Sequence, residues 1–282
     1  MVVVNLQSTA IAAILAVFVS ATTPKCPPRF AWENAQLTDT TIAKSSGLLF
    51  GFGSNAASSD FNSKLGTPKC KALPGDASWP SKTVWSLFNA TLDGVLIKTV
   101  PLAAPCYNNW PQHDAATCQS VRDHWNDPHL HVNDPTSAMF PIYQGRTCLP
   151  TDDPSSSNCT LGGYASYSVA VTKVWQIQLA LNFARNANLR LVVRNTGHDF
   201  GDKSIGSGAL SVWTHQLKDI DFIADYNCRG YHGPAFKLGS GVLTEEVYGA
   251  AEQNNVTVVG GECRVGHPLK HQIRRKTQLT TA

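Results

Sequence analysis

The 282-residue chain lacks the short motifs that identify the commonest metal and nucleotide sites. It has eight cysteines but no C-x-x-C pair, which argues against a structural zinc site. It has no Walker phosphate loop with its lysine. Gly206-Ser207-Gly208 leads into the strand-like segment 209–213 instead of a helix, so it does not match a Rossmann fingerprint.

Charge is also scarce. Only 15% of the residues are charged, the formal net charge is +3, and no basic stripe is interleaved with aromatic residues. This pattern argues against a nucleic-acid partner. With 43% apolar residues the chain is typical of a globular protein, and this length can bury about three quarters of the unfolded surface.

No apolar run is long enough to span a bilayer. Ala10 to Val19 is apolar but short, and Val19-Ser20-Ala21 has the small residues of a signal-peptidase site. The first seven residues contain no Lys or Arg, and the alternative is a buried N-terminal helix. We predict a signal peptide at 1–21, secretion and no membrane partner. Three N-glycosylation sequons fit that compartment, at Asn89, Asn158 and Asn255.

An even number of cysteines in a secreted chain predicts disulfide bonds. They are Cys26, Cys70, Cys106, Cys118, Cys148, Cys159, Cys228 and Cys263. Sequence alone does not fix their connectivity. Short loops favour the pairs Cys106 with Cys118 and Cys148 with Cys159.

Residues 22–160 form a mostly irregular region rich in Pro, Asn, Asp and Ser, with one convincing helix at 81–92. We expect a disulfide-stapled extension packed on a later core. Several residues in it could be drawn as a metal site: His124, His129, His131, Asp123, Asp127 and Asp134. A solvated loop makes the same pattern without metal, and we favour that interpretation and predict no metal.

From residue 164 the pattern changes to alternating strands and helices. A strand at 167–171 is followed by Thr172 as a possible N-cap and by a helix with an apolar stripe, which we predict to face the core. The stripe consists of Val174, Ile177, Leu181 and Ala184. Asn186 to Asn188 end this helix before a strand at 189–193.

The alternation continues to residue 263. We expect strands at 209–213, 219–224, 236–242 and 256–259, a turn around 227–230, and a helix at 245–252 capped by Thr244. The loop that follows the strand at 189–193 therefore lies at the carboxyl end of a strand. That is the usual edge for ligand binding in open α/β sheets.

This loop, Arg194-Asn195-Thr196-Gly197-His198-Asp199-Phe200-Gly201, carries the strongest functional pattern. A strand that breaks into a glycine-punctuated loop can turn successive N–H groups towards phosphate oxygens. Arg194 could add charge, and His198 stands where a ligand would lie. Taken alone, the same residues are good turn formers, and His198 with Asp199 could simply satisfy backbone groups.

The longer string 193–214 resembles the FAD-binding segment of PCMH-type flavoproteins, the vanillyl-alcohol-oxidase and berberine-bridge-enzyme-like oxidoreductases. Phrases at 70–76, 79–81 and 101–106 resemble the N-terminal part of secreted fungal members. The resemblance implies an α+β fold, with a PCMH-type domain of two small α/β subdomains, and FAD as the cofactor. It implies that the loop wraps the FAD pyrophosphate and that His198 is bonded to the flavin 8α carbon. The FAD-binding residues implied are Arg194, Asn195, Thr196, Gly197, His198, Asp199, Gly201, Ser204, Gly208, Gly261 and Cys263.

Cys263 is a second attachment candidate by the same resemblance. It lies 65 positions after His198 (263 − 198), on a glycine-rich turn after a strand. The following Arg264-Val265-Gly266 lacks the Pro-Thr of the family pattern. The alternative for Cys263 is a disulfide.

The likeness stops after Gly266, where residues 267–282 become basic. We expect a signal peptide at 1–21, the extension at 22–160, an incomplete FAD domain at 161–266 and an atypical tail at 267–282. Three alternatives explain this ending. The chain is a C-terminally truncated product without its substrate domain, the gene model is faulty, or the basic tail binds an acidic partner. No catalytic base can be named.

The resemblance implies an FAD-linked oxidase or dehydrogenase. It would oxidise a small alcohol, a sugar or a secondary metabolite by hydride transfer to flavin, with dioxygen as a possible acceptor. The alternatives are a secreted flavin-binding protein without activity and a disulfide-rich binding module without flavin.

Overall fold

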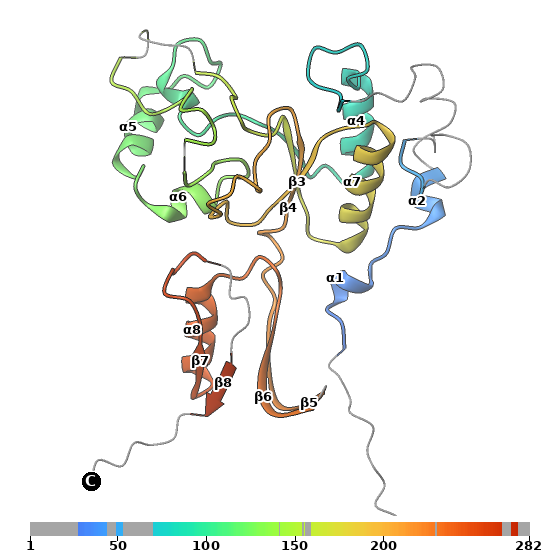
Figure 1. Cartoon of the computed structure of the whole chain (residues 1–282), viewed down its shortest axis with the longest axis vertical. Helices are drawn as coiled ribbons and strands as arrows, with labels where there is room; N and C mark the ends of the chain where they lie inside the picture. The colour runs from blue at the N-terminus through green and yellow to red at the C-terminus, as the bar shows by residue number, and fades with distance from the viewer. Residues whose placement is uncertain are drawn as a thin grey trace, which may run out of the picture.

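The computed structural model describes residues 28–43, 49–52, 70–140, 142–153, 155, 159–228 and 230–266, and the backbone of 272–275. The predicted signal peptide, Cys26 and Asn158 lie outside these residues. In the view of Figure 1, one part carries a small sheet flanked by helices α4 and α7 on one side and by α5 and α6 on the other. Below it lies a second part with α8, β7, β8 and the long β5–β6 hairpin.

The central sheet has the strand order β1-β2-β4-β3. Its strands are β1 Leu96–Lys98, β2 Tyr167–Ala170, β4 Leu210–Trp213 and β3 Leu191–Arg194. The last three are parallel, and β1 joins the edge in the antiparallel direction. Val169 pairs with Val212, and both are almost fully buried, because the inner strands of a covered parallel sheet are apolar on both faces. The arrangement is mixed α/β.

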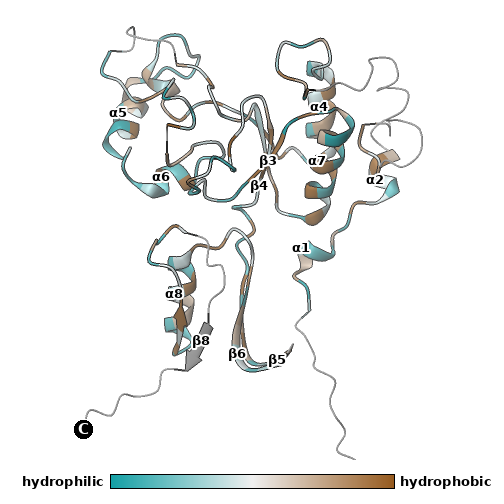
Figure 2. Cartoon of the chain, viewed as in Figure 1, coloured by the Kyte–Doolittle hydropathy of each residue, from teal (hydrophilic) through white to brown (hydrophobic). Residues whose placement is uncertain are grey.

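Helices α4 (Lys82–Thr91) and α7 (Val174–Asn186) pack their apolar faces into the core beside this sheet. Both ribbons carry brown, apolar stretches in Figure 2. The ring centroids of Phe88 and Phe183 are 4.2 Å apart, and those of Trp85 and Tyr167 are 4.0 Å apart. The predicted helix at 81–92 is confirmed as α4, and the Ser81 hydroxyl accepts the N–H of Val84 as its cap.

The predicted core face of α7 is correct only in part. Ala184 is buried and Ile177 packs against the core, but Leu181 is 43% exposed. The fully buried side chains include Leu179, Ala180 and Phe183. The helix is turned because Gln176 is also buried, where its amide donates to the carbonyl of Leu92. Its side-chain oxygen accepts N–H groups at the helix start, so the N-cap is Lys173 and not Thr172.

The region expected to be an irregular extension supplies part of the sheet core. Strand β1 and helix α4 belong to it, and Phe50 packs with Phe88 and Phe183. The short helices α1 (Ala31–Asn34) and α2 (Asp39–Ala43) precede them. This region is therefore less irregular than its composition predicts.

Both predicted disulfide pairs are confirmed. Cys106 is bonded to Cys118 and Cys148 to Cys159, around a small core of their own. This part contains the 3-10 helix η1 (Ala104–Cys106), α5 (Ala115–Asp123) and α6 (Pro128–Val132). Cys228 is also disulfide-bonded, whereas Cys70 and Cys263 are free thiols.

The second part of the molecule begins with the antiparallel hairpin of β5 (Ile220–Cys228) and β6 (Tyr231–Leu238). It continues through α8 (Thr244–Gln253) to β7 (Val256–Val259), which pairs with β8 (Gln272–Arg275). Part of the expected atypical tail thus forms a strand. Thr244 is the first residue of α8, and Leu243 takes the N-cap position that was predicted for Thr244.

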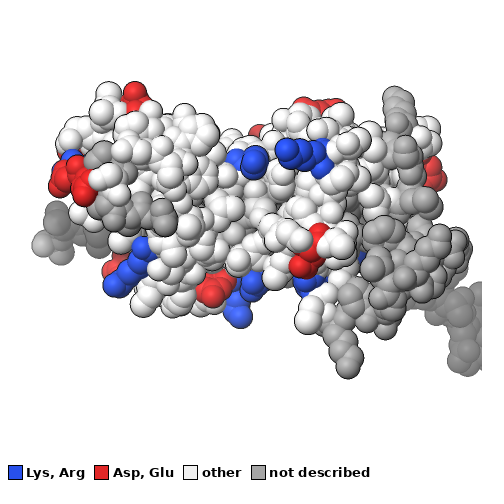
Figure 3. Space-filling view, turned by 90° about the horizontal axis from the view of Figure 1, so that it is seen from above, with Lys and Arg blue, Asp and Glu red and all other residues white. Residues whose placement is uncertain are grey.

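Lys, Arg, Asp and Glu are scattered among uncharged residues on the face seen in Figure 3, without a continuous basic patch among the atoms coloured there. Within the described part of the chain, no helix has the length and apolarity needed to cross a membrane.

Candidate functional site

The candidate site lies where the loop after β3 meets the turn after β7. Strands β3 and β4 are parallel, and Arg194 at the end of β3 pairs with Trp213 at the end of β4. The loop 195–208 therefore leaves from the carboxyl edge of the sheet, as predicted. The turn 260–266 reaches the same place from the other part of the molecule.

His198 and Cys263 touch at this meeting point. The Nε2 atom of His198 lies 2.9 Å from the Sγ atom of Cys263, and both side chains are partly buried. The thiol is free, so the alternative of a disulfide at Cys263 is wrong. Two nucleophilic side chains that are 65 residues apart in the sequence are thus brought into contact.

Arg194 does not offer its side-chain charge to an external ligand. Its guanidinium is 1% exposed and donates to four carbonyl oxygens. Those of Asp134, His131 and Ser137 lie at 2.7, 2.8 and 2.5 Å, and that of Thr196 lies at 3.3 Å. Burial lowers the pKa of Arg194 to about 10, against the effect of nearby acidic groups, so the group stays charged at neutral pH. The guanidinium ties segment 131–137 to the base of the loop.

The first loop residues are fixed by polar contacts. Asn195 donates from its side chain to the carbonyl of Ser240 at 2.6 Å, and its own carbonyl accepts the indole N–H of Trp213 at 3.1 Å. Thr196 is buried. Gly197 has φ +72°, and a Cβ there would lie 2.9 Å from both the Arg194 guanidinium and the Ser137 carbonyl. Only glycine fits at this position without displacement.

Asp199 links the middle of the loop to its second half. Its carboxylate accepts the N–H of Lys203 at 2.6 Å and the hydroxyl of Ser204. Burial pushes the pKa of Asp199 upwards, but these hydrogen bonds outweigh it and hold the pKa below its usual range. The carboxylate therefore makes hydrogen bonds within the loop and stabilises its conformation.

The predicted glycines occupy different settings. Gly208 has φ +69° and lies against Pro74 and Leu73, so its role is a close approach of backbone to the N-terminal region. Gly201 and Gly261 are exposed, and a Cβ at Gly261 would meet nothing within 4 Å. Gly261 accepts the hydroxyl of Tyr248 at its carbonyl, at 2.8 Å.

An aromatic group beside His198 was not foreseen from the sequence. The rings of Phe140 and Phe200 are 4.5 Å apart, and each meets the His198 ring edge-on at 6.4 and 6.2 Å. Tyr143 donates its hydroxyl to the carbonyl of Phe200. Phe200 is 70% exposed, and an exposed aromatic next to two nucleophiles forms an open apolar wall suited to a planar ring.

His215, which follows β4, contacts the first residues of the loop. It is 3% exposed, stacks on Trp213 at 5.8 Å, and its Nδ1 lies 3.4 Å from the side-chain oxygen of Asn195. Burial, reinforced by the charge of Lys218, lowers the pKa of His215 to about 4. The ring is therefore neutral at physiological pH.

The histidines considered above as metal ligands have other partners. Both ring nitrogens of buried His131 are hydrogen-bonded, to Ser137 and to the carbonyl of Trp125, each at 2.7 Å. His129 lies 3.3 Å from Glu245. Among the described residues no group of three or more His, Cys, Asp and Glu could hold a metal ion.

The chemistry that this site offers is nucleophilic. An imidazole and a thiol are in contact, and aromatic side chains lie beside the imidazole. Phe140, Tyr143 and His215 come from segments that no pattern in the sequence ties to His198. The only sequence signal for this group was Phe200 within the loop motif.

Comparison with known proteins finds flavoproteins among those similar to this chain. A VAO-type flavoprotein oxidase, VAO615, of Thermothelomyces thermophilus is 45% identical over 199 residues, which are 70% of this chain and 34% of that protein. The FAD-linked oxidoreductase ZEB1 of Gibberella zeae is 45% identical over 194 residues, 69% of this chain and 34% of that protein. The FAD-linked oxidoreductase patO of Aspergillus clavatus is 42% identical over 200 residues, 71% of this chain and 34% of that protein. The chain thus spans about a third of the length of these relatives.

Two solved structures of VAO-type flavoproteins from Myceliophthora thermophila C1 are similar. MtVAO615 superposes with a TM-score of 0.68 at 44% identity, over 71% of this chain and 36% of that one. MtVAO713 gives 0.66 at 36% identity, over the same shares of the two chains. No family model matches the sequence.

Proposed function

This chain belongs to the family of VAO-type FAD-linked oxidoreductases, and from that premise we propose that it is the FAD-binding part of a secreted enzyme in which His198 carries the flavin covalently. Cys263 provides the second attachment point. The two parts of the molecule correspond to the two small α/β subdomains of a PCMH-type domain.

The observation that carries this proposal is the 2.9 Å contact between His198 and Cys263. The two side chains belong to different parts of the molecule, and the segment between them contains most of the second part. A neutral imidazole nitrogen and a thiol are the two side-chain nucleophiles from which the family builds its flavin bonds. Because the two side chains touch, both would be able to bond to the same flavin ring.

Several residues of the chain would hold the cofactor, and no base for the substrate is assigned among them. The loop 195–201 offers its backbone to the pyrophosphate, with Asp199 and Ser204 keeping its curvature. Phe140 and Phe200, which pack against each other, would offer the flavin ring an apolar wall beside His198. The bound flavin supplies a two-electron acceptor for the hydride of a small alcohol, a sugar or a secondary metabolite, with dioxygen as the terminal acceptor.

The attachment is tested by expressing the secreted chain, denaturing it in acid and measuring the flavin absorbance that stays with the polypeptide. We expect close to one flavin per chain, mapped by peptide mass spectrometry to the peptides of His198 and Cys263. His198→Ala should remove the histidyl bond and Cys263→Ser the thioether. Cys70→Ser is the matched control, because Cys70 is the other free thiol among the described residues and lies away from the site.

The outcomes separate the alternatives. Covalent flavin that remains after either single change, but is lost after the double change His198→Ala with Cys263→Ser, assigns both bonds. Covalent flavin without turnover on alcohols and sugars favours a flavin-binding protein without activity. A colourless chain that folds and lacks flavin in every preparation contradicts the proposal and favours a disulfide-rich binding module.

A further inference from the structure

We propose that Glu245 is a positioning residue that holds the Cys263 thiol against His198, and so decides how completely the second flavin bond forms. This inference rests on the proposed function, because it concerns the same site. It assigns a role to a half-buried carboxylate that lies outside the loop motif.

The turn that carries Cys263 is built onto the first turn of α8. The first N–H groups of a helix have no partner within the helix, and here the turn supplies them. The N–H of Thr244 donates to the carbonyl of Gly266 at 2.9 Å, and that of Glu245 donates to the carbonyl of Arg264 at 3.1 Å. The Thr244 hydroxyl adds a second bond to Gly266 at 2.9 Å. The position of Cys263 therefore depends on the start of α8.

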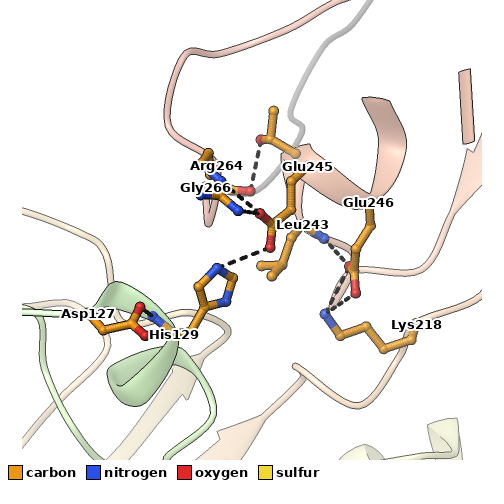
Figure 4. Close-up of polar contacts among 9 residues, drawn as sticks. Asp127, His129, Lys218, Leu243, Glu245, Glu246, Arg264 and Gly266 are labelled. Atoms are coloured by element: carbon orange, nitrogen blue, oxygen red, sulfur yellow. Dashed lines mark hydrogen bonds and ion pairs between the residues drawn. The ribbon is translucent and has the colours of Figure 1, made fainter. Parts of the chain in front are cut away.

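The Glu245 side chain connects this turn to the first part of the molecule (Figure 4). One carboxylate oxygen accepts from the guanidinium of Arg264, the residue after Cys263, at 2.9 and 3.0 Å. The other lies 3.3 Å from Nε2 of His129 on α6. Segment 131–137, which follows directly, is the one that Arg194 ties to the base of the His198 loop. One carboxylate thus links the supports of both nucleophiles.

The neighbouring Glu246 has a different task. Its carboxylate accepts the N–H of Leu243 at 2.6 Å and the ammonium of Lys218 at 2.9 Å, so it caps α8 and does not reach the Cys263 turn. Glu252 lies exposed at the other end of the same helix. Glu252→Gln therefore removes the same charge from α8 without touching the turn, which makes it the matched control for Glu245→Gln.

The experiment compares the parent chain with Glu245→Gln, Arg264→Gln and Glu252→Gln. Peptide mapping gives the fraction of flavin bonded at His198 and at Cys263. We expect Glu245→Gln and Arg264→Gln to lower the Cys263 bond about three- to fivefold relative to the His198 bond, because a partly exposed ion pair has a modest effect. Glu252→Gln should leave both fractions unchanged. A loss of the fold would lower both bonds together.

Hydrogen exchange gives a readout that needs no flavin. The N–H of Gly266 donates to the carbonyl of Cys263 at 3.1 Å, so its protection reports the turn itself. We expect faster exchange in peptides covering 243–246 and 263–266 of Glu245→Gln, and unchanged exchange in β2 and β4. Unchanged exchange at both peptides, or an unchanged Cys263 fraction, overturns the role of Glu245. If the parent chain carries no flavin at Cys263, the proposed attachment fails, and the exchange data still decide the positioning.

Discussion

The two segments that meet at the site are supported in different ways. The His198 loop stands on a buried cation, Arg194, and on the buried ring of His215. The Cys263 turn combines buried contacts with exposed ones. Val265 is 1% exposed and Thr244 is 2% exposed, whereas the side chains of Arg264 and Glu245 are 77% and 26% exposed. One half of the site is thus set by the interior of the fold, and the other half depends in part on an ion pair near the surface.

This difference indicates which half can vary. A buried polar group without its partners costs far more than a solvated ion pair, so the His198 loop tolerates few changes. The ion pair of Glu245 with Arg264 at the Cys263 turn can be removed at a smaller cost in stability. We expect substitutions under the loop to reduce folding and attachment together, and substitutions under the turn to act on Cys263 alone.

The largest effect is expected for Arg194→Met. The change leaves four carbonyls without their donor, three of them in segment 131–137. We expect the free energy of unfolding to fall by about 3–5 kcal/mol, measured by urea denaturation, with loss of flavin at His198. Arg146→Met is the control, since Arg146 is exposed and lies outside the loop 195–208. A similar loss in both variants would contradict the special position of Arg194.

A pH-dependent effect comes next, at His215. Its pKa is about 4 in the folded chain and about 6.5 when unfolded. The unfolded state therefore takes up the proton first, and stability is lost as the pH falls from about 6.5 to about 4. We expect His215→Gln to remove up to roughly 3 kcal/mol of this pH dependence, measured by urea denaturation at pH 7.5 and 4.5. His113→Gln, at an exposed histidine, should keep the parent profile.

The smallest effect is expected for Thr244→Val, which tests the turn. The change removes the hydroxyl bond to the Gly266 carbonyl and keeps the backbone bond to the same atom. We expect a loss of about 1 kcal/mol in stability together with a lower Cys263 bond fraction. Thr257→Val on the exposed face of β7 is the control. If Thr244→Val lowers the fraction of flavin bonded at His198 as much as the fraction bonded at Cys263, the two halves of the site do not differ in the way proposed.

The sequence predicts local features well where one residue type has one physical use. Ser81 caps α4, the short cysteine spacings give both disulfides, and the strand before the loop ends where the glycine motif begins. It fails for α7, because the apolar spacing of Leu181 competes with a buried amide, Gln176, that turns the helix. A prediction from the spacing of apolar residues does not take buried hydrogen bonds into account.

The site shows a second limit. The family resemblance named His198 and Cys263, but no local pattern predicts that their side chains meet, since that depends on how the two parts of the molecule pack. The charge of Arg194 was expected to face a ligand, yet its guanidinium donates hydrogen bonds to carbonyls of a distant segment. Resemblance identifies the residues of a site, and the three-dimensional packing decides which way they point.

The confinement of Arg194 has a consequence for the response of the site to salt. A positive charge that is 1% exposed is surrounded by carbonyl dipoles, so mobile ions screen it much less than they screen a lysine at the surface. The acidic groups near it are those of Asp134 and Asp199, one on each segment that the guanidinium joins. Their attraction to Arg194 should therefore persist at high ionic strength, where ion pairs between exposed side chains weaken.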